Sequence, residues 1–549
     1  MTLARKLFGF PSLTLAAAVE ALVAIKLFPD YYGTQSHLAA VGTLLCANWA
    51  FGLVFWTVVY PRVFSPLRHI PGPRAYISAA HRSLVVKDRP SGDLFIDIAK
   101  EYPGEDLVAL NVLRNQIALM SPRLMADLLV HRCYDFSKPK RISSFLRYIL
   151  GDGLIIVEED QHKSLRKITT PAFHYRHIKE LYPMMWAKGE SLTKALKQDM
   201  KETGTSTIEL NSWASKVTLD IIGIAGLGRK FDAVEQGHDP LAGIYEQLLE
   251  PSREKLVFSM LCLAIGRSVI KTIPWRMNKT FDHLTGQLED ICRPLIEEKR
   301  VAIAEKGDDH FDVLSLLMKS GDFSDDALKD QLLTFLAAGH ETTASALTWA
   351  CYLLTKHPEV QEKLREEING ALPPDVANMP AAELAGILEQ LPYLNGIMHE
   401  TLRLYPTVPL TMRQALRDTR IGDQFIPKGT DIIVSIWYIN RSTEIWGADA
   451  SEFKPERWVG DNGKPNQNGG ASSNYDFMTF LHGPRSCIGQ GFAKAEMRCL
   501  LAGMVRSFKW TLNMDDGLVL PRGVITIRPE NGMYLKLTPL EEGSSEKVG

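Results

Sequence analysis

The chain contains little cysteine and no large excess of charge of either sign. Seven cysteines are spread over 549 residues, their number is odd, and no C-x-x-C pair occurs. This usage argues against a disulfide framework and a zinc ribbon, and it indicates a reducing compartment for most of the protein. Lys and Arg total 62 against 64 Asp and Glu, giving a net charge of −2. That balance argues against a nucleic-acid binder, which needs a basic surplus.

Nucleotide-binding motifs and internal repeats are also missing. No G-x-G-x-x-G follows a strand-like run, and no G-x-x-x-x-G-K-[ST] occurs. Any redox reaction would therefore take its electrons from another protein. What the chain does have is a globular composition, with 45% hydrophobic and 23% charged residues. A chain of this length and composition can bury a large core without disulfides.

Two apolar runs stand near the N-terminus. Residues 38–60 carry no charge, and as a helix they would be about 34 Å long, enough to cross a bilayer core of about 30 Å. We predict a transmembrane helix here, with a buried core helix as the alternative. The earlier run, 7–28, is interrupted by Glu20 and Lys26. It is a candidate first span, interfacial helix or signal peptide, and we favour a hairpin or an interfacial helix.

Basic residues follow the second apolar run closely, namely Arg62, Arg68 and Arg74. The positive-inside rule then places the rest of the chain in the cytosol. Two sequons, at Asn278 and Asn440, would on that topology never meet the glycosylation machinery.

Pro71-Gly72-Pro73 predicts a stiff elbow between two parts of the chain, an anchor at 1–69 and a globular body at 70–549. The body reads as mainly α with small β-sheets, an α+β class. Apolar periodicity predicts long helices, and short apolar runs predict strands. The predicted helices are 181–203, 283–305, 325–356 and 379–404, the strands are 108–112, 432–436 and 524–527, and 460–474 is a polar loop.

The most informative segment is FLHGPRSCIG, which ends at Gly489. Gly483 favours a turn before Cys487, and Gly489 allows a close backbone approach after it. A helix-like run begins at 490, so helix amides and the nearby Arg485 would favour the thiolate. A lone thiolate in such a loop suits one axial haem bond. The alternative is a buried free cysteine.

This segment resembles the FxxGxRxCxG haem-binding signature of the cytochrome P450 family. The resemblance extends over nearly the whole chain from about residue 70, and it implies the cytochrome P450 fold with an N-terminal transmembrane anchor. It implies Cys487 as the proximal ligand of haem b and Arg485 as a partner of a haem propionate. Phe480, Gly483 and Gly489 are the other haem-binding positions of the signature.

The predicted helix 325–356 contains AAGHETTA. Glu341 can relay protons, and Thr342 can bond a backbone carbonyl or a ligand. Gly339 indicates either a large group lying against the helix or a close helix–helix contact. The run resembles the family's [AG]Gx[DE]T[TS] motif, which implies that Glu341 and Thr342 deliver protons to dioxygen. We interpret His340 as structural rather than as a second iron ligand.

A glutamate–arginine pair, Glu400 and Arg403, lies at i and i+3 on one predicted helical face. Alone it would be an ordinary surface pair. It resembles the family's ExxR motif, and Arg457 resembles the arginine of the PERF-type motif, with Trp458 where Phe is common. The resemblance implies a buried network that supports the thiolate side of the haem.

Further haem contacts are implied by resemblance. His162 and Arg166 are similar to the WxxxR element with His in place of Trp, and Arg413 is similar to the next propionate-binding arginine. An exposed basic helix is the alternative for the first pair. Lys163 and Lys167 are candidates for a rim where NADPH–cytochrome P450 reductase docks, with solvated surface lysines as the alternative.

Substrate contacts are implied only by the family pattern, and they indicate an apolar small molecule. The candidates are Phe145, Phe335, Val408, Leu410 and Val524. The anchor and loops are similar to those of fungal microsomal members, many of which act on terpenoids, polyketides or alkaloids.

We therefore predict a haem-thiolate monooxygenase in the endoplasmic reticulum membrane, with its catalytic domain in the cytosol. It would hydroxylate or epoxidise its substrate with dioxygen and electrons from NADPH through the reductase, with cytochrome b5 as a second candidate partner and no nucleic acid. The rivals are fatty-acid or xenobiotic hydroxylation, a non-catalytic haem sensor, and a haem-dependent isomerase.

Overall fold

The computed structural model describes residues 9–27, 37–73, 89–90, 92–110, 115–236, 240–249, 252–306, 312–321, 323–523 and 525–540. Arg74 and Val524, both named above, lie outside these ranges.

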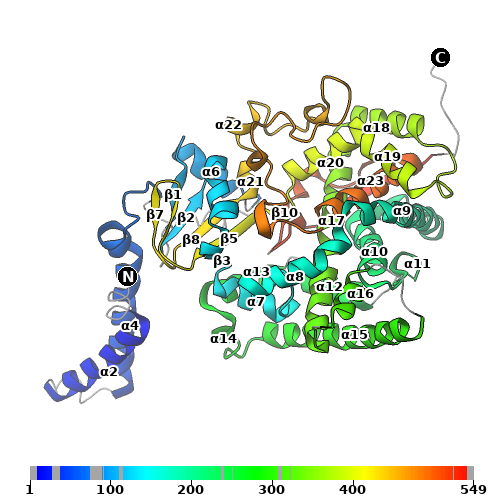
Figure 1. Ribbon diagram of the computed structural model, residues 1–549. Helices are drawn as coiled ribbons and strands as arrows, with labels where there is room; N and C mark the ends of the chain where they lie inside the picture. Colours follow the sequence, from blue (N-terminus) through cyan, green and yellow to red (C-terminus); the bar gives the residue numbers. More distant parts are fainter. Residues whose placement is uncertain are drawn as a thin grey trace.

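The N-terminal part is a helical hairpin that projects from the body (Figure 1). Helix α2 (Phe10–Leu27) packs along α4 (His37–Val54), which continues into the π-helix η1 (Phe55–Phe64). Asn48 Nδ2 donates to Glu20 Oε2 at 2.7 Å, so the acidic residue that interrupts the first apolar run has a partner within the hairpin. The favoured hairpin arrangement is the one observed.

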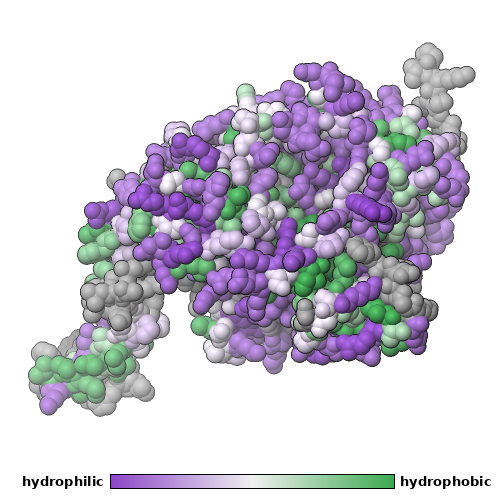
Figure 2. Space-filling view, viewed as in Figure 1, coloured by the Kyte–Doolittle hydropathy of each residue, from purple (hydrophilic) through white to green (hydrophobic). Residues whose placement is uncertain are grey.

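Within the described residues, one helix, Val41–Phe64, is long and apolar enough to cross a membrane. It begins three residues later and ends four residues later than predicted. Apolar side chains cover the outside of the hairpin, whereas the surface of the body in the same view is mostly hydrophilic (Figure 2). Leu15, Leu22, Phe51 and Val54 are all exposed by half or more.

The body is mainly helical, and its elements follow one another in the order shown by the colours of Figure 1. Its helices are α6 (Asp93–Glu101), α7 (Lys140–Leu150), α8 (Glu159–Thr169), α9 (Tyr175–Thr203), α10 (Leu210–Ile222), α11 (Ala233–Gln236), α12 (Pro240–Leu249), α13 (Arg253–Ile265), α14 (Arg267–Ile270), α15 (Arg276–Lys306), α16 (Val313–Ser320), α17 (Asp325–Lys356), α18 (Pro358–Ala371), α19 (Ala381–Gln390), α20 (Pro392–Leu404), α21 (Ile436–Ile439), α22 (Thr443–Trp446) and α23 (Gln490–Ser507).

Short strands form small sheets beside the helices, as the sequence predicted. A five-stranded sheet has the order β1-β2-β8-β5-β3, in which only the β2–β8 pair is parallel, with Ile117 opposite Ile432. A three-stranded sheet has the order β4-β12-β9, and β6–β7 and β10–β11 are separate antiparallel pairs. The strands are β1 (Leu107–Ala109), β2 (Gln116–Leu119), β3 (Phe136–Ser137), β4 (Thr207–Glu209), β5 (Leu410–Ala415), β6 (Thr419–Ile421), β7 (Gln424–Ile426), β8 (Asp431–Ser435), β9 (Phe508–Leu512), β10 (Pro521–Arg522), β11 (Arg528–Pro529) and β12 (Tyr534–Pro539).

Two predicted elements differ from the structure. The helix expected over 379–404 is broken into α19 and α20, because Pro392 has no amide hydrogen and starts a new helix at its first turn. The strand expected over 524–527 is not seen in the part of this run that the structure describes, 525–527. Ile525 and Thr526 lie in the turn between β10 and β11, where the backbone bends and makes no strand pairing.

Helix α17 is the central element of the body. The Ser324 hydroxyl accepts a hydrogen bond from the Ala327 N–H, and Asp325 and Asp326 in the first turn favour the helix dipole. Most of its 32 residues are buried against neighbouring helices. A helix buried nearly all round positions its few accessible side chains rigidly.

The body begins earlier in the chain than predicted. Ser65 is fully buried, and its hydroxyl donates to Asn115 Oδ1 at 3.0 Å, while Leu67 belongs to the hydrophobic core of the five-stranded sheet. The Ala109 N–H donates to the Pro71 carbonyl at 2.7 Å. The elbow is therefore docked onto β1, and packing with the body starts at Ser65, five residues ahead of the predicted boundary.

Candidate active site

The cysteine loop is held by its own backbone. The Cys487 N–H donates to the Phe480 carbonyl at 2.8 Å, which closes the loop just before α23 begins. Gly483 has a φ of +78°, and a Cβ there would lie 2.1 Å from the carbonyl oxygen of Leu129. Only glycine fits this turn. A Cβ at Gly489 would make only ordinary contact, so the close approach predicted at Gly489 is not made by any described residue.

The thiol of Cys487 is surrounded by protein yet accessible at its surface. Burial raises the pKa of the thiol, while the Gly489 N–H and the positive charge of Arg166 act in the opposite direction. The sequence suggested that Arg485 favours the thiolate. In the structure this cation is Arg166, because the Arg485 side chain points away from the thiol.

Arg485 points instead toward the segment before α7. Its Nη1 donates to the carbonyl oxygens of Cys133 and Phe136, at 2.6 and 3.0 Å. Its Nη2 forms an ion pair with Glu158 Oε2 at 2.7 Å, and its buried Nε has no hydrogen-bond partner.

Four further basic groups surround this arginine. Arg166 lies on α8, and its Nη1 donates to the Ser486 carbonyl at 2.6 Å. Burial lowers the pKa of Arg413 to about 10 and that of Lys138 to about 8. Burial, reinforced by Arg485, lowers the pKa of His162 to about 4, and its Nδ1 has no hydrogen-bond partner.

We call these five bases the basic cradle (Lys138, His162, Arg166, Arg413 and Arg485), and all of them except Arg166 interact with the carboxylate of Glu158. Buried cations are costly unless anions pair with them. The excess of positive charge and the unpartnered nitrogens on His162 and Arg485 fit an anionic group such as the propionates of haem. The exposed-helix alternative for His162 is wrong, because its side chain is buried.

The motif on α17 divides into two sides. The Thr342 hydroxyl donates to the Ala338 carbonyl one turn earlier, at 2.8 Å. Glu341 is buried, and its Oε1 accepts a hydrogen bond from Thr526 Oγ1 at 2.8 Å. Burial raises the pKa of the Glu341 carboxyl, while Arg528 and Thr526 lower it.

Neighbouring residues of this motif serve helix packing. A Cβ on Gly339 would lie 2.5 Å from Ile222 Cγ1 on α10, so the glycine permits a close helix–helix contact. Of the two readings of this glycine, the structure therefore supports the second. His340 is buried, its Nδ1 bonds the Leu336 carbonyl, and burial lowers its pKa to about 4. It is structural, as interpreted.

Phe173 joins the cysteine loop to α17. Its ring stacks on Phe335 with 5.9 Å between centroids, and its Cε1 would lie 3.9 Å from a Cβ on Gly489. Away from its ends, α17 is buried except for a half-exposed stretch that includes Ala338 and Thr342. Phe173 thus packs between this helix and the cysteine loop.

The candidate substrate residues separate by burial. Val408 and Leu410 are half-exposed. Phe145 and Phe335 are almost fully buried in the hydrophobic core. Both rings therefore pack in the hydrophobic core and expose almost no surface.

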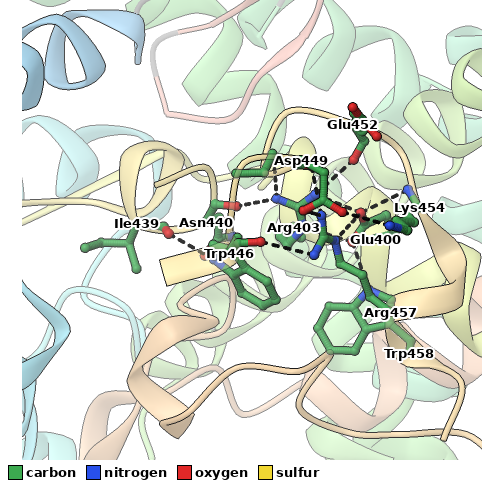
Figure 3. A network of polar contacts seen from close by, with 11 residues as sticks. Glu400, Arg403, Ile439, Asn440, Trp446, Asp449, Glu452, Lys454, Arg457 and Trp458 are labelled. Carbon is green, nitrogen blue, oxygen red and sulfur yellow. Dashed lines mark hydrogen bonds and ion pairs between the residues drawn. The ribbon is translucent and has the colours of Figure 1, made fainter. Parts of the chain in front are cut away.

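The network on α20 is assembled from segments far apart in sequence (Figure 3). Glu400 and Arg403 are fully buried and form a bidentate pair, with Nε–Oε2 at 2.8 Å and Nη2–Oε1 at 2.7 Å. Arg403 also donates to the carbonyl oxygens of Asn440, Ala450 and Glu452. One helix residue thus holds three points of the long connection before the cysteine loop.

Arg457 and Trp458 complete this network from the other side (Figure 3). Arg457 Nε lies 3.4 Å from Glu400 Oε1, and its Nη2 donates to the Asp449 carbonyl at 2.8 Å. Trp458 is fully buried, and its Nε1 donates to Glu400 Oε2 at 2.9 Å. Sequence reasoning noted Trp458 only as a departure and missed this bond. The signal was the indole N–H, which needs a partner when buried.

Lys163 and Lys167 are exposed on α8, where they stand before and after Arg166 in the sequence. Lys163 pairs with Asp160 at 2.9 Å and lies 4.4 Å from the ring centre of Tyr134. The sequons are not accessible, since Asn278 and Asn440 are buried and their amide groups are hydrogen-bonded.

A lone exposed cysteine in a closed loop, a basic cradle, and a long helix that carries an acid and an alcohol are the features of a haem-thiolate oxidoreductase. A family model described as Cytochrome P450 matches residues 72–536. The chain is 39% identical over 544 residues to Cytochrome P450 monooxygenase sphH of Aspergillus fumigatus, covering 97% of this chain and 98% of the relative. It is 36% identical over 595 residues to Cytochrome P450 monooxygenase FUM15 of Gibberella moniliformis, covering 97% and 99%. It is 34% identical over 511 residues to Cytochrome P450 monooxygenase ptmK of Penicillium ochrochloron, covering 91% and 98%.

The chain therefore belongs to the cytochrome P450 family, and its curated relatives are named as monooxygenases. The predicted family, the mainly helical fold and the enzyme class are confirmed.

Proposed function

We propose that this protein is a membrane-anchored monooxygenase that holds haem b through Cys487 and oxidises an apolar small molecule of fungal secondary metabolism. The observation that carries the proposal is the exposed Cys487 in a closed loop next to the basic cradle, whose five bases are buried or partly buried.

The residues present fit the cofactor. Cys487 would supply the axial thiolate, and the basic cradle would bind the propionates by charge-assisted hydrogen bonds. Loss of the thiol proton on metal binding would offset the raised pKa of Cys487. When bound, the haem supplies dioxygen activation, so that one oxygen atom enters a C–H or C=C bond of the substrate.

The chain's own groups would control protons and water. The Thr342 hydroxyl, held on the Ala338 carbonyl, is placed to pass a proton at the accessible stretch of α17. Glu341 would supply that proton. Its raised pKa makes the carboxyl a better donor near neutral pH than an ordinary glutamate.

The hairpin of α2 and α4 would anchor the protein in the endoplasmic reticulum membrane, with the body in the cytosol. Its exposed apolar side chains and the span Val41–Phe64 support this arrangement. NADPH–cytochrome P450 reductase would supply the electrons at the face carrying Lys163 and Lys167, with cytochrome b5 as a second candidate donor.

The proposed ligand is tested by the carbon-monoxide difference spectrum of the reduced protein. We expect wild type to show the thiolate-specific band and Cys487→Ala to lose it. Cys499 is a buried cysteine on α23, the helix that follows the cysteine loop. Cys499→Ala is therefore the matched control and should keep the band. If Cys487→Ala keeps the band, or if purified wild type holds no haem, the proposal is wrong.

A further inference from the structure

The C-terminal hairpin of β10 and β11 is docked on α17 at two points, one helical turn apart. Thr526 Oγ1 donates to Glu341 Oε1 at 2.8 Å, and Ser345 Oγ donates to the Ile527 carbonyl. The Ile527 N–H donates to the Thr407 carbonyl at 2.9 Å, which ties the same turn to the segment before β5. The turn therefore occupies a defined position against the helix face that carries the acid.

Glu341 is held toward this hairpin and not toward the alcohol beside it. In the part of the chain that the structure describes, no hydrogen bond joins the side chains of Glu341 and Thr342, and the Thr342 hydroxyl is used by Ala338. Arg528 on β11 is buried and acts on the same carboxyl. His340, next along α17, is kept neutral at pH 7 by burial, so Arg528 is the charged group that faces Glu341.

The two hairpin residues act on the acid in the same direction. A hydroxyl that donates to a carboxylate and a nearby guanidinium both stabilise its charged form. Burial on α17 favours the neutral form. The protonation state of Glu341 therefore depends on whether the hairpin stays against α17. Among the described residues, Thr526 and Arg528 are the hairpin residues that act on the carboxyl group.

We propose that Thr526 and Arg528 are positioning residues that hold the Glu341 carboxyl group and determine when it donates its proton. When the hairpin moves away from α17, the neutral acid is free to turn toward Thr342. The proton leaves the Glu341 carboxyl, passes the Thr342 hydroxyl to the dioxygen side of the site, and is replaced from solvent. This inference rests on the proposed function, since it assumes that Glu341 supplies protons.

The first test reads the carboxyl directly in the holoenzyme. The infrared carbonyl stretch of the protonated acid is assigned by its loss in Glu341→Gln and followed against pH. We expect Thr526→Val to move the titration upward by about one pH unit, the effect of losing a hydrogen bond to a charged group. Thr526→Ser, which keeps the hydroxyl, should restore the wild-type titration.

The second test reads proton delivery with dioxygen and NADPH as the only added reactants. Peroxide released per NADPH is measured with a purified fungal reductase and no added substrate. We expect Thr526→Val and Glu341→Gln both to change this ratio at least twofold, and Thr526→Ser to leave it near wild type.

Thr348→Val is the matched control, because it removes a buried threonine hydroxyl from the same helix, two turns beyond Glu341, without touching the hairpin. The inference is overturned if Thr348→Val reproduces both effects, or if Thr526→Val leaves the infrared titration unchanged. If Glu341→Gln leaves the peroxide ratio unchanged, the proton-supply role is wrong and the inference falls with it. Retention of the carbon-monoxide band in every variant separates these outcomes from loss of the haem site.

Discussion

Trp458 shows how one departure from a family pattern changes the chemistry of a buried site. The indole donates to Glu400 and stacks on His399 with 4.8 Å between ring centroids. A phenylalanine at this position would fill similar space but offer no donor. The carboxylate of Glu400 in this chain therefore relies on one more hydrogen bond than the motif alone indicates.

Trp458→Phe is expected to lower the free energy of unfolding by about 1–3 kcal/mol, because it leaves Glu400 Oε2 one donor short in a dry environment. Urea unfolding followed by fluorescence and by haem absorbance measures the effect. Trp446→Phe is the control for loss of an indole, since its N–H bonds the Ile439 carbonyl and not Glu400. An equal loss in both variants would mean that the charged acceptor Glu400 adds nothing beyond the loss of an ordinary indole hydrogen bond and of ring volume.

At the scale of elements, the contact between α10 and α17 positions the stretch of α17 that contains Glu341 and Thr342. Gly339 brings the helices together at Ile222, and one turn away the Thr218 hydroxyl donates to the His340 carbonyl at 2.9 Å. From the sequence, Gly339 indicated either a large group lying against the helix or a close helix–helix contact. The choice depends on what packs against this glycine, and a helix that lies 117 residues away in the sequence cannot be placed from the local pattern.

Gly339→Ala is expected to cost about 1–3 kcal/mol of unfolding free energy, since the new methyl would overlap Ile222. Ile222→Ala removes the overlapping carbon, so the double variant should lose less than the sum of the single losses. The double-mutant cycle measures this coupling. A strictly additive cycle would contradict the contact as the reason for the glycine.

For the whole molecule, three buried histidines link stability to pH. Burial lowers the pKa of His162 and of His340 to about 4, and it lowers that of His399 still further. Unfolded histidine titrates near pH 6.5. Between pH 6.5 and 4 the unfolded chain therefore binds more protons than the folded one, so stability falls as the pH falls through this range.

We expect each of these histidines to contribute up to about 3 kcal/mol to the loss of stability between pH 6.5 and 4. His399→Phe keeps a ring beside Trp458 and removes the titrating group, so the slope of unfolding free energy against pH should decrease by up to one proton. An unchanged slope in His399→Phe would show that this histidine is not neutral in the folded protein.

Local chemistry determined what the sequence could predict. The cysteine loop, the run of small residues with its acid and alcohol, and the long amphipathic helices depend on neighbours within one or two turns, so their residue types and spacing were readable. The anchor hairpin followed in the same way from apolar runs longer than a core helix needs. Pro392, which divides α19 from α20, was equally local and was overlooked.

Only the tertiary structure decided which distant groups share a site. Arg166 rather than Arg485 acts on the thiol, Lys138, Arg413 and Arg485 come together from three segments around Glu158, and Thr526 reaches Glu341 across 185 residues. These contacts depend on the direction in which each side chain leaves a packed element. Sequence spacing carries no such direction beyond the element itself, because long-range packing, not local propensity, sets it.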